Sequence, residues 1–389
     1  MKWENRGREF DEIGKNFVGK DIIIFAAGDE GRKFYEKTKF LNAVTAFVDK
    51  DKEKQKSGWC GVPVLSFEEF AKLDRNKYIV VIALKDLFNY RAQAFVMMTN
   101  LGYDAGRTLF YQDIFLHYYL PIYALYAKDI LYFPSICLVT TTQCNLNCRC
   151  CLNFTSYNKD KRHIPIERLK ENIDLLMKNV DYLDFFHITG GESFLYPKLL
   201  EFIEYIGEKW RNKINDLCVV TNGTILPTEK MCKVFKEYSV HIQLDDYRRT
   251  IKERSKIEEI SEIFDKEQVN YDILQVPAWI NMNPNENFGI GLSDEDLKNR
   301  FTTCNSPLSC VSEGRLFNCV YNSFAATASL ISKDSVEDDY LDLRQNPSKK
   351  ELLEYRMGFN KRGYVEYCKR CPGHEWANVH DVLPGEQIK

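Results

Sequence analysis

Short apolar runs alternate with amphipathic segments over the first hundred residues. The apolar runs are rich in β-branched residues and fit strands, whereas the segments between them carry apolar residues at helical spacing. The expected strands and helices are, in chain order, residues 21–27, 31–41, 44–48, 62–65, 67–73 and 78–84. This alternation predicts a small parallel sheet of Rossmann type with helices between its strands.

A second alternating series begins near residue 134. Its expected strands are residues 136–140, 182–188, 218–221 and 240–244, and its expected helices are 166–180, 199–210 and 229–238. Repeated βα units of this length predict a partial or complete α/β barrel, which carries its chemistry at the carboxyl ends of its strands. The apolar segment 114–127 between the two series is too short to span hydrocarbon and is expected to be a linker helix.

The expected fold class is therefore α/β, with four parts along the chain. A Rossmann-like domain of the nucleotide-binding type takes residues 1–112, and the linker helix takes 113–133. The partial barrel takes residues 134–299, and a small cysteine-rich extension takes 300–389.

The charge balance argues against a nucleic-acid partner. Lys and Arg total 53 against 56 for Asp and Glu among 389 residues, and the formal net charge is -3. Such a chain has no excess of positive charge for a phosphate backbone. The polar start of the chain lacks a secretory signal, so we expect a cytoplasmic protein without a membrane partner.

The chain has thirteen cysteines, and most of them are clustered in the sequence. Four lie within residues 144–151, three within 304–319 and two within 368–371, while the other four are scattered and fit ordinary core positions. Thiols stay reduced in a cytoplasmic protein, so metal binding explains the clusters better than disulfides do.

The first turn of the N-terminal series is rich in glycine. Residues 26–31 resemble the dinucleotide fingerprint, with Gly28 and Gly31 in place and Ala26 where the first glycine belongs. Asp49 ends the next strand, where the ribose-binding acid of such folds lies. Two acidic residues beside the helix N-terminus would repel a phosphate, so a Rossmann-like domain without a nucleotide is an equal alternative. The stretch resembles the small nucleotide-binding domains of sugar-modifying and polysaccharide-assembly proteins.

Cys144, Cys148 and Cys151 follow the first expected barrel strand. Three closely spaced thiolates can ligate three irons of a [4Fe–4S] cluster and leave the fourth iron open. Cys150 is an alternative third ligand, although the spacing favours Cys151. A zinc knot would need a fourth ligand, and His163 is the neighbour available for it.

This spacing, CxxxCxxC, resembles the signature of the radical SAM superfamily, whose members use S-adenosylmethionine (SAM). The resemblance extends to Gly190, Gly191 and Glu192 at the end of the second barrel strand, which match the GGE motif for the methionyl amino group of SAM. It implies a partial barrel of radical SAM type, SAM as a cofactor, and an electron donor such as flavodoxin or ferredoxin.

Other SAM contacts follow from the same resemblance. Asn222 and Gln243 end later strands, where the family contacts the ribose or the methionyl carboxylate. The family usually carries an aromatic residue just before its third cysteine, but Cys150 occupies that position here, so adenine packing is expected to fall to Phe154.

Cys304, Cys319, Cys368 and Cys371 offer thiolates for a second [4Fe–4S] cluster. Their spacing resembles the twitch domain, an auxiliary-cluster extension related to the SPASM domain. Gly314 fits the turn of a hairpin with strands at 309–312 and 315–318. Four-thiolate zinc is the alternative.

The resemblance implies that SAM yields a 5′-deoxyadenosyl radical, which takes a hydrogen atom from the substrate. A closed second cluster that relays an electron favours dehydrogenation, whereas epimerisation needs a hydrogen donor such as the spare thiol of Cys310. The two extra domains favour a small-molecule substrate: a sugar, an aminocyclitol or a nucleotide-linked sugar in carbohydrate biosynthesis.

Two other functions stay open from the sequence. A peptide-modifying maturase is the main rival, although such relatives often carry a winged-helix leader-binding domain. A non-enzymatic iron–sulfur redox sensor is the second. Tyr247, Arg248, Arg249 and Trp279 lie near late strand ends and are expected either to contact the substrate or to be ordinary surface and core residues.

Overall fold

The computed structural model describes residues 8–85, 89–286, 291–304, 308–332, 337–373 and 379–388. It divides into two compact units, Gly7–Leu131 and the chain from Tyr132 onward. Within the described residues, no helix is both long and apolar enough to cross a membrane.

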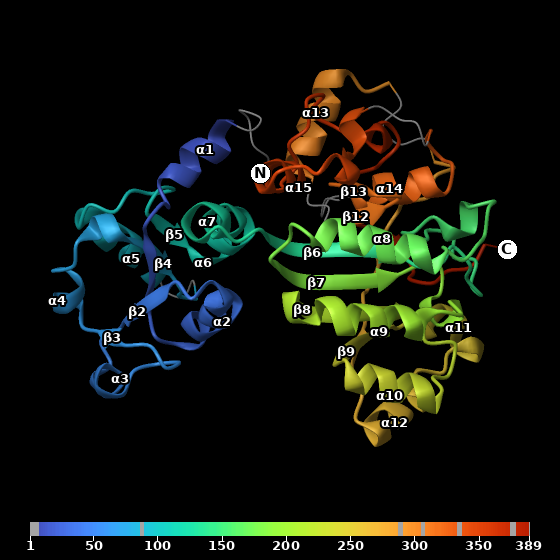
Figure 1. Cartoon of the computed structure of the whole chain (residues 1–389), viewed down its shortest axis with the longest axis horizontal. Coiled ribbons are helices and arrows are strands. Elements are labelled where there is room, and N and C mark those ends of the chain that lie inside the picture. Colours follow the sequence, from blue (N-terminus) through green and yellow to red (C-terminus); the bar gives the residue numbers. More distant parts are fainter. Residues whose placement is uncertain are drawn as a thin grey trace. The chain divides into compact units, whose positions relative to one another are not determined.

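The first unit is built on a five-stranded sheet with the order β3-β2-β1-β4-β5 (Figure 1). Every neighbouring pair is parallel. The strands are β1 (Asp21–Phe25), β2 (Val44–Val48), β3 (Val64–Leu65), β4 (Tyr78–Ile82) and β5 (Leu109–Tyr111). The helices are α1 (Arg8–Lys15), α2 (Asp29–Thr38), α3 (Lys52–Ser57), α4 (Phe67–Phe70), α5 (Tyr90–Asn100), α6 (Gln112–Ile114) and α7 (Leu120–Lys128), with a π-helical turn at Phe115–Tyr119. The expected Rossmann-type sheet is confirmed.

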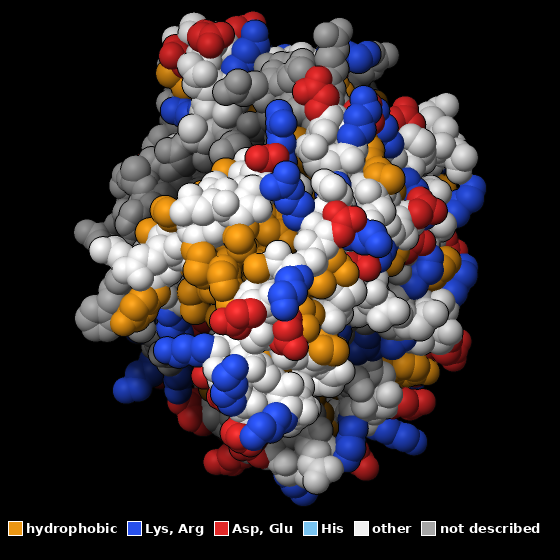
Figure 2. Space-filling view, turned by 90° about the vertical axis from the view of Figure 1, so that its left-hand side faces the viewer, with side chains coloured by type: hydrophobic (Ala, Val, Ile, Leu, Met, Phe, Trp, Pro, Cys, Tyr) orange, Lys and Arg blue, Asp and Glu red, His pale blue; other side chains and the backbone are white. Residues whose placement is uncertain are grey.

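The surface of the molecule carries mixed charge. On the face shown in Figure 2, Lys and Arg are interspersed with Asp and Glu around a patch of hydrophobic side chains. Tyr90 and Val96 of α5 are 55% and 58% exposed, and they are among the large hydrophobic residues that the first unit leaves in solvent.

The second unit is built on an eight-stranded sheet with the order β10-β9-β8-β7-β6-β12-β13-β14 (Figure 1). Its strands are β6 (Tyr132–Val139), β7 (Tyr182–Thr189), β8 (Ile214–Thr221), β9 (Val240–Asp245), β10 (Asn270–Leu274), β12 (Ser309–Ser312), β13 (Arg315–Phe317) and β14 (Leu341–Asp342). Separately, β11 (Trp279–Ile280) pairs with β15 (Val379–Val382). The helices are α8 (Ile166–Met177), α9 (Leu199–Trp210), α10 (Glu229–Glu237), α11 (Arg248–Ile251), α12 (Ile257–Glu267), α13 (Asp294–Thr303), α14 (Val320–Thr327) and α15 (Lys349–Arg356).

Strands β6 to β10 are all parallel, so their carboxyl ends meet at one edge of the sheet. β10 and β14 are the two edge strands, as a partial barrel requires. The chain turns at Glu313 and Gly314, both with positive φ, and the β12–β13 hairpin then pairs β12 in parallel with β6. The predicted α/β fold and the predicted hairpin are both confirmed.

Helix α8 shows how the sequence pattern produces this packing. Ile166, Leu169, Ile173 and Leu176 recur at helical spacing, and each is at most 1% exposed. Each buried Leu or Ile side chain contributes about 1.5–3 kcal/mol to stability. The apolar stripe of α8 therefore holds the helix against the second unit's core.

Strand β8 begins at Ile214, earlier than the expected 218, because polar residues at its start have partners across the sheet. His241 of β9 lies between Asp216 of β8, with Nδ1–Oδ2 at 3.2 Å, and Asp272 of β10, with Nε2–Oδ1 at 2.5 Å. The hydrogen bonds to Asp216 and Asp272 raise the pKa of His241 above its usual value. This ion pair network joins three neighbouring strands.

We predict that His241→Gln lowers the free energy of unfolding more at pH 6 than at pH 9. A histidine whose pKa is raised in the folded state stabilises the fold below its unfolded pKa of about 6.5, and this contribution disappears as the pH rises through the folded value. Urea unfolding of both proteins across this pH range measures the effect, and Asp216→Asn should reduce its pH dependence. A stability difference that does not vary with pH would contradict the prediction.

Candidate functional site

The loop after β6 brings three of its four cysteines into one cluster. Cys144, Cys148 and Cys151 pack together around Leu146 and Ile251. Tyr247 and Trp279 cover the same cluster, with their rings 5.2 Å apart and edge to face. The three thiols are therefore close to one another beneath an apolar cover.

Hydrogen-bond donors point at two of these sulfurs. The Leu146 backbone N–H lies 3.4 Å and the Asn222 amide nitrogen 3.8 Å from Cys144 Sγ, and the Gln387 amide nitrogen lies 3.3 Å from Cys148 Sγ. Burial raises the pKa of Cys144 to about 11 and that of Cys148 to about 12, and the neighbouring Cys151 adds to both shifts. Donors at the sulfur favour the thiolate form, which is the form that ligates metals.

Cys150 faces a different part of the structure. It is 1% exposed, and its thiol donates a hydrogen bond to Oδ1 of Asn281 at 3.2 Å. Burial raises the pKa of Cys150, and its charged neighbours are Arg149 and Glu286 rather than the other three thiols. The arrangement groups Cys151, and not Cys150, with Cys144 and Cys148.

Gly190 and Gly191 hold the end of β7 against the cysteine loop. Gly191 N donates to Thr141 O at 2.7 Å, and Glu192 N donates to Gln143 O at 2.8 Å. A Cβ on Gly191 would overlap the backbone of Gln143, and one on Gly190 would lie 2.5 Å from Thr141 O. Glycine is thus required here for the close contact of two backbone segments.

Glu192 is 1% exposed and accepts three hydrogen bonds. They come from Phe194 N at 2.9 Å, Thr221 Oγ1 at 2.7 Å and Asn222 N at 2.8 Å. Burial raises the pKa of Glu192 to about 7, and the three donors lower it in part. The carboxyl group therefore ties the ends of β7 and β8 together.

The other expected SAM contacts are placed unevenly. Asn222 is 7% exposed and contacts both Cys144 and Asn145, so it lies beside the cysteine loop. Gln243 donates to Asp245 within β9, at 2.9 Å. Phe154 is completely buried, and its ring packs 5.2 Å from that of Tyr367.

Sequence reasoning missed the role of the chain's last residues. Asn147 N donates to Gln387 Oε1 at 2.7 Å, and Arg149 N donates to Glu386 O, also at 2.7 Å. An ion pair joins the side chains of Arg149 and Glu386. A polar tail without periodicity gives no signal for this contact, which joins residues 240 positions apart in the sequence.

The four C-terminal cysteines line one narrow cavity. Cys304 follows α13, Cys319 precedes α14, and Cys368 and Cys371 lie in and after the turn Glu366–Lys369. Burial raises the pKa of Cys371 and of Cys368 above the usual range, and the nearby Cys319 adds to both shifts. These thiols come from segments far apart in the sequence, as the expected second site requires.

Both donor sets suit iron–sulfur clusters, because thiolates beneath an apolar cover are their usual ligands. The first loop offers three thiols, and the C-terminal cavity offers four, beside the rings of Tyr321 and Tyr367. In the described ranges, no three His, Cys, Asp or Glu side chains are placed to hold a single metal ion.

The N-terminal turn is held by its own side chains. Ala27 N donates to Asp49 Oδ2 at 2.8 Å, and Asp51 N donates to Asp49 Oδ1 at 3.0 Å, so backbone amides occupy both oxygens of the expected ribose-binding acid. A Cβ on Gly31 would overlap Ala26 O, whereas one on Gly28 would meet nothing within 4 Å. Gly31 is thus needed for packing, and Gly28 leaves open space.

Cys310 lies in a buried core. It is 1% exposed, it lies opposite Cys137 where β12 pairs with β6, and its thiol donates to Val311 O at 3.7 Å. Among the expected substrate contacts, Tyr247 and Trp279 cover the first cysteine cluster. Arg248 forms ion pairs with Asp246 and Glu258, and Arg249 donates to Pro277 O at 3.2 Å.

Comparison with known proteins identifies the barrel part of the chain. Residues 138–266 match the family model of the Radical SAM superfamily. The antilisterial bacteriocin subtilosin biosynthesis protein AlbA of Bacillus subtilis (strain 168) is 32% identical over 108 residues, which are 27% of this chain and 22% of AlbA. The match thus spans about a fifth of that relative's length.

Two solved structures show a limited likeness. BtrN in complex with AdoMet and 2-DOIA has a TM-score of 0.41 at 18% identity, over 64% of this chain and 98% of BtrN. Native anSMEcpe with bound AdoMet has the same TM-score and identity, over 65% of this chain and 94% of that one.

The family match begins within β6 and ends within α12, so it includes the loop with Cys144, Cys148 and Cys151 and the Gly190-Gly191-Glu192 turn that packs against it. On the family match together with these two motifs, residues 138–266 of the chain form a domain of the radical SAM superfamily.

Proposed function

We propose that the chain is a radical SAM oxidoreductase that acts on a carbon of a small polar substrate. The observation that carries the proposal is the assembly of Cys144, Cys148 and Cys151 into one cluster at the carboxyl end of β6. Those three residues would hold a [4Fe–4S] cluster, which together with SAM supplies a 5′-deoxyadenosyl radical for hydrogen-atom abstraction.

The residues around the cluster would position it and keep water away. Asn222 and Gln387 direct amide N–H groups at the sulfurs of Cys144 and Cys148. Tyr247 and Trp279 cover the cysteines with their rings. Enclosure of this kind protects a reactive intermediate from side reactions.

Cys304, Cys319, Cys368 and Cys371 would hold a second [4Fe–4S] cluster, which would supply an electron acceptor. Four protein thiolates leave no iron free for the substrate, so that cluster suits electron transfer rather than substrate binding. We therefore favour dehydrogenation over epimerisation. The burial of Cys310 against Cys137 supports this choice, because a hydrogen-donating thiol has to reach the substrate.

The proposed substrate class is based on the parts of the chain outside the barrel. A Rossmann-type first unit and a cysteine-rich extension together fit a sugar, an aminocyclitol or a nucleotide-linked sugar as the substrate. An electron donor such as flavodoxin or ferredoxin would supply the electron for SAM cleavage.

Peptide modification is the second candidate, because AlbA is a bacteriocin biosynthesis protein and shares 32% identity over 108 residues. The parallel sheet of the first unit differs from a winged-helix leader-binding domain. A redox sensor without enzymatic activity is the remaining alternative, and such a sensor would yield no 5′-deoxyadenosine from SAM.

We predict that Cys144→Ala, Cys148→Ala and Cys151→Ala each abolish the cleavage of SAM, because each removes one iron ligand. Cys150→Ala should retain cleavage, since its thiol is directed at Asn281. The measurement is the release of 5′-deoxyadenosine under anaerobic conditions with a chemical reductant.

Normal turnover in the Cys144→Ala or Cys148→Ala variant would overturn the proposed function. If Cys150→Ala lost cleavage while Cys151→Ala kept it, the third ligand would be Cys150 instead.

We predict two four-iron clusters per chain. Anaerobically reconstituted wild-type protein should contain about eight irons, and the Cys144/Cys148/Cys151→Ala triple variant should contain about four. Elemental analysis together with electron paramagnetic resonance of the reduced protein measures both. If the triple variant holds no iron but about one tightly bound zinc, the C-terminal cysteines form a four-thiolate zinc site. The case for dehydrogenation would then fail, and epimerisation would replace it.

We predict that Gly28→Val weakens the binding of a nucleotide-linked sugar by at least about tenfold without loss of iron. A Cβ at this position meets nothing within 4 Å, so the fold should tolerate the change and only a ligand close to the backbone should be displaced. Calorimetry with uridine diphosphate sugars measures binding.

Gly31→Val is the matched control for packing. Its Cβ would overlap Ala26 O, so it should cost about 1–3 kcal/mol of stability. If the wild-type protein binds no nucleotide and no nucleotide sugar, the first unit has a structural or interaction role instead.

A further inference from the structure

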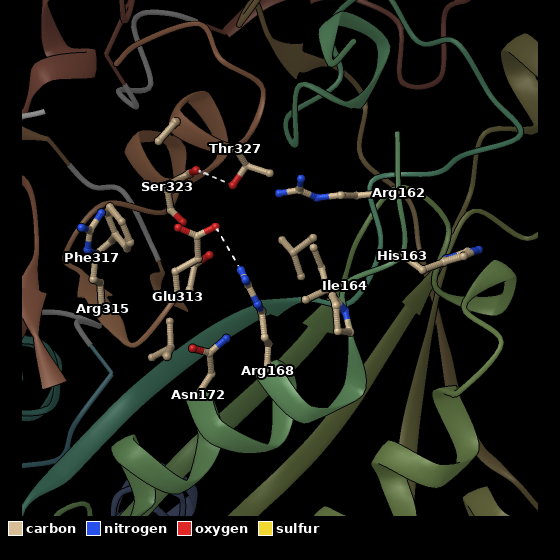
Figure 3. Close-up of a pocket in the computed structure, with 15 residues that line it drawn as sticks. Arg162, His163, Ile164, Arg168, Asn172, Glu313, Arg315, Phe317, Ser323 and Thr327 are labelled. Atoms are coloured by element: carbon tan, nitrogen blue, oxygen red, sulfur yellow. Dashed lines mark hydrogen bonds and ion pairs between the residues drawn. The ribbon is translucent and has the colours of Figure 1, made fainter. Parts of the chain in front are cut away.

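A cavity of about 250 Å³ lies in the second unit, among α8, the β12–β13 hairpin and α14 (Figure 3). Strands β6 and β12 pair at only two positions, which end at Cys137 and Cys310. Val139, two residues after Cys137, and Val311, the residue after Cys310, both line the cavity. The cavity therefore lies where two neighbouring strands part.

Two buried polar side chains of this cavity each have one polar group without a hydrogen-bond partner among the described residues. Asn172 is 5% exposed, and its amide oxygen accepts a hydrogen bond from Gly314 N at 2.7 Å. The amide nitrogen is then the free end, and in Figure 3 it faces the side on which Arg168 and Glu313 lie. Ser323 is 2% exposed, and the hydrogen bonds that it makes with described residues, to Thr327 and Cys319, are through its backbone.

Buried polar groups are almost always hydrogen-bonded, and leaving one unpaired costs about 1–3 kcal/mol. Asn172 and Ser323 both line the cavity, where water or a ligand can pair with the amide nitrogen of Asn172 and the hydroxyl of Ser323. Water can fill this role in any polar cavity, so the charges around it decide which solute the cavity would prefer.

The lining carries more positive than negative charge. Arg162, Arg168 and Arg315 contribute three guanidinium groups, and Glu313 is the acidic residue among the lining. Arg162 points into the cavity in Figure 3, and its ion pair is with Asp160, which is 60% exposed. Arg168 lies 4.0 Å from Glu313, too far for a short hydrogen bond. Each guanidinium carries five N–H donors, so Arg162 and Arg168 keep donors for a ligand.

Helix α8 adds backbone donors at the same place. Ile164 and Pro165 line the cavity, and α8 begins at the next residue. Pro165 is the N-cap and has no side-chain hydrogen bond to the first turn. The first N–H groups of a helix have no partner within it, and the helix dipole favours an anion there.

We propose that this cavity binds the phosphate monoester group of a small polyol. Arg162, Arg168 and the amide nitrogen of Asn172 donate to the phosphate oxygens. Ser323 and Glu313 accept hydrogen bonds from hydroxyl groups of the ligand. Val139, Ile164 and Phe317 contact its carbon skeleton.

The size of the cavity limits the ligand. About 250 Å³ equals the volume of roughly eight water molecules, which suits a sugar phosphate rather than a whole nucleotide or a peptide. A second cavity of about 270 Å³ shares Arg168, Asn172, Glu313 and Arg315 with the first.

The inference rests on the proposed function where it names a substrate. Val139 lies five residues before Cys144, and Phe317 lies two residues before Cys319. The cavity is thus lined by strands that lead to both cysteine sites, and a phosphorylated sugar bound there is the substrate class that we assign to the enzyme.

Calorimetry on the full-length, anaerobically reconstituted protein tests the proposal with glucose 6-phosphate as the probe. We expect glucose 6-phosphate to bind at least about tenfold more tightly than glucose, and inorganic phosphate to compete with it. Arg162→Gln and Arg168→Gln should each weaken binding by about 10-fold or more, the effect of losing a hydrogen bond to a charged group. Arg32→Gln, an exposed arginine of the first unit paired with Asp29, is the matched control and should change nothing.

Asn172→Asp is the sharpest variant, because it keeps the oxygen that Gly314 N needs and replaces the free donor with a second carboxylate oxygen. It should abolish binding of the phosphate ester. If this variant fails to fold, the exposed Arg168 still supplies the test. Equal binding of glucose and glucose 6-phosphate, tighter binding of glucuronate, or unchanged binding in both arginine variants would overturn the proposal.

The release of 5′-deoxyadenosine, measured on the same samples, separates the two conclusions. Phosphate-ester binding without SAM cleavage would support the proposed binding site and contradict the proposed function. Cleavage of SAM without phosphate-ester binding would support the proposed function and contradict the proposed binding site.

Discussion

The site depends on the contact between the end of β7 and the loop that follows β6. Gly191 N and Glu192 N donate to the carbonyl groups of Thr141 and Gln143, so the residue just before Cys144 is fixed by the neighbouring strand. A side chain on Gly191 would overlap Gln143 and push the loop away. The spacing of the cysteines in the sequence can bring their thiols together only because this contact fixes where the cysteine loop begins.

Glu192 carries the same constraint to the next strand. Its carboxyl group accepts from Thr221 and from Asn222 N, and the Asn222 side chain in turn contacts Cys144 Sγ. Burying a carboxylate is costly, which is why burial raises the pKa of Glu192 to about 7. Three donors offset part of this cost. The three consecutive residues Gly190, Gly191 and Glu192 thus have two structural effects. They hold the cysteine loop against β7, and through Asn222 they connect the end of β8 to the sulfur of Cys144.

Much of this architecture follows from the sequence. Strands such as Val44–Val48 and helix Leu199–Trp210 begin and end where their apolar periodicity does. The hairpin at Gly314 is equally local, because its turn needs two residues with positive φ. The four C-terminal cysteines, which the family resemblance groups, line one cavity.

The remaining features could not be predicted from the sequence because they depend on polar contacts between residues far apart in the chain. Gln387 donates a hydrogen bond to Cys148, 239 positions earlier in the sequence, and no pattern in the polar tail predicts this contact. Asp49 looks like a ribose ligand in the sequence, but its two oxygens accept from backbone amides of the turn. Asn172 and Ser323 look like ordinary helix residues, and only the separation of β6 from β12 gives them a cavity to face.

The two cysteine sites share one apolar wall, and this limits how a polar substrate can reach them. Phe154 follows Cys151 by three residues, Tyr367 precedes Cys368, and their rings pack 5.2 Å apart in a core that also holds Cys371. Water and polar groups are excluded from such a core. Val139 and Phe317 belong to this wall on one side and line the cavity with Arg162 and Arg168 on the other. A charged substrate bound by these arginines, as we propose, would have to extend past Val139 for its reacting carbon to approach the cysteine loop.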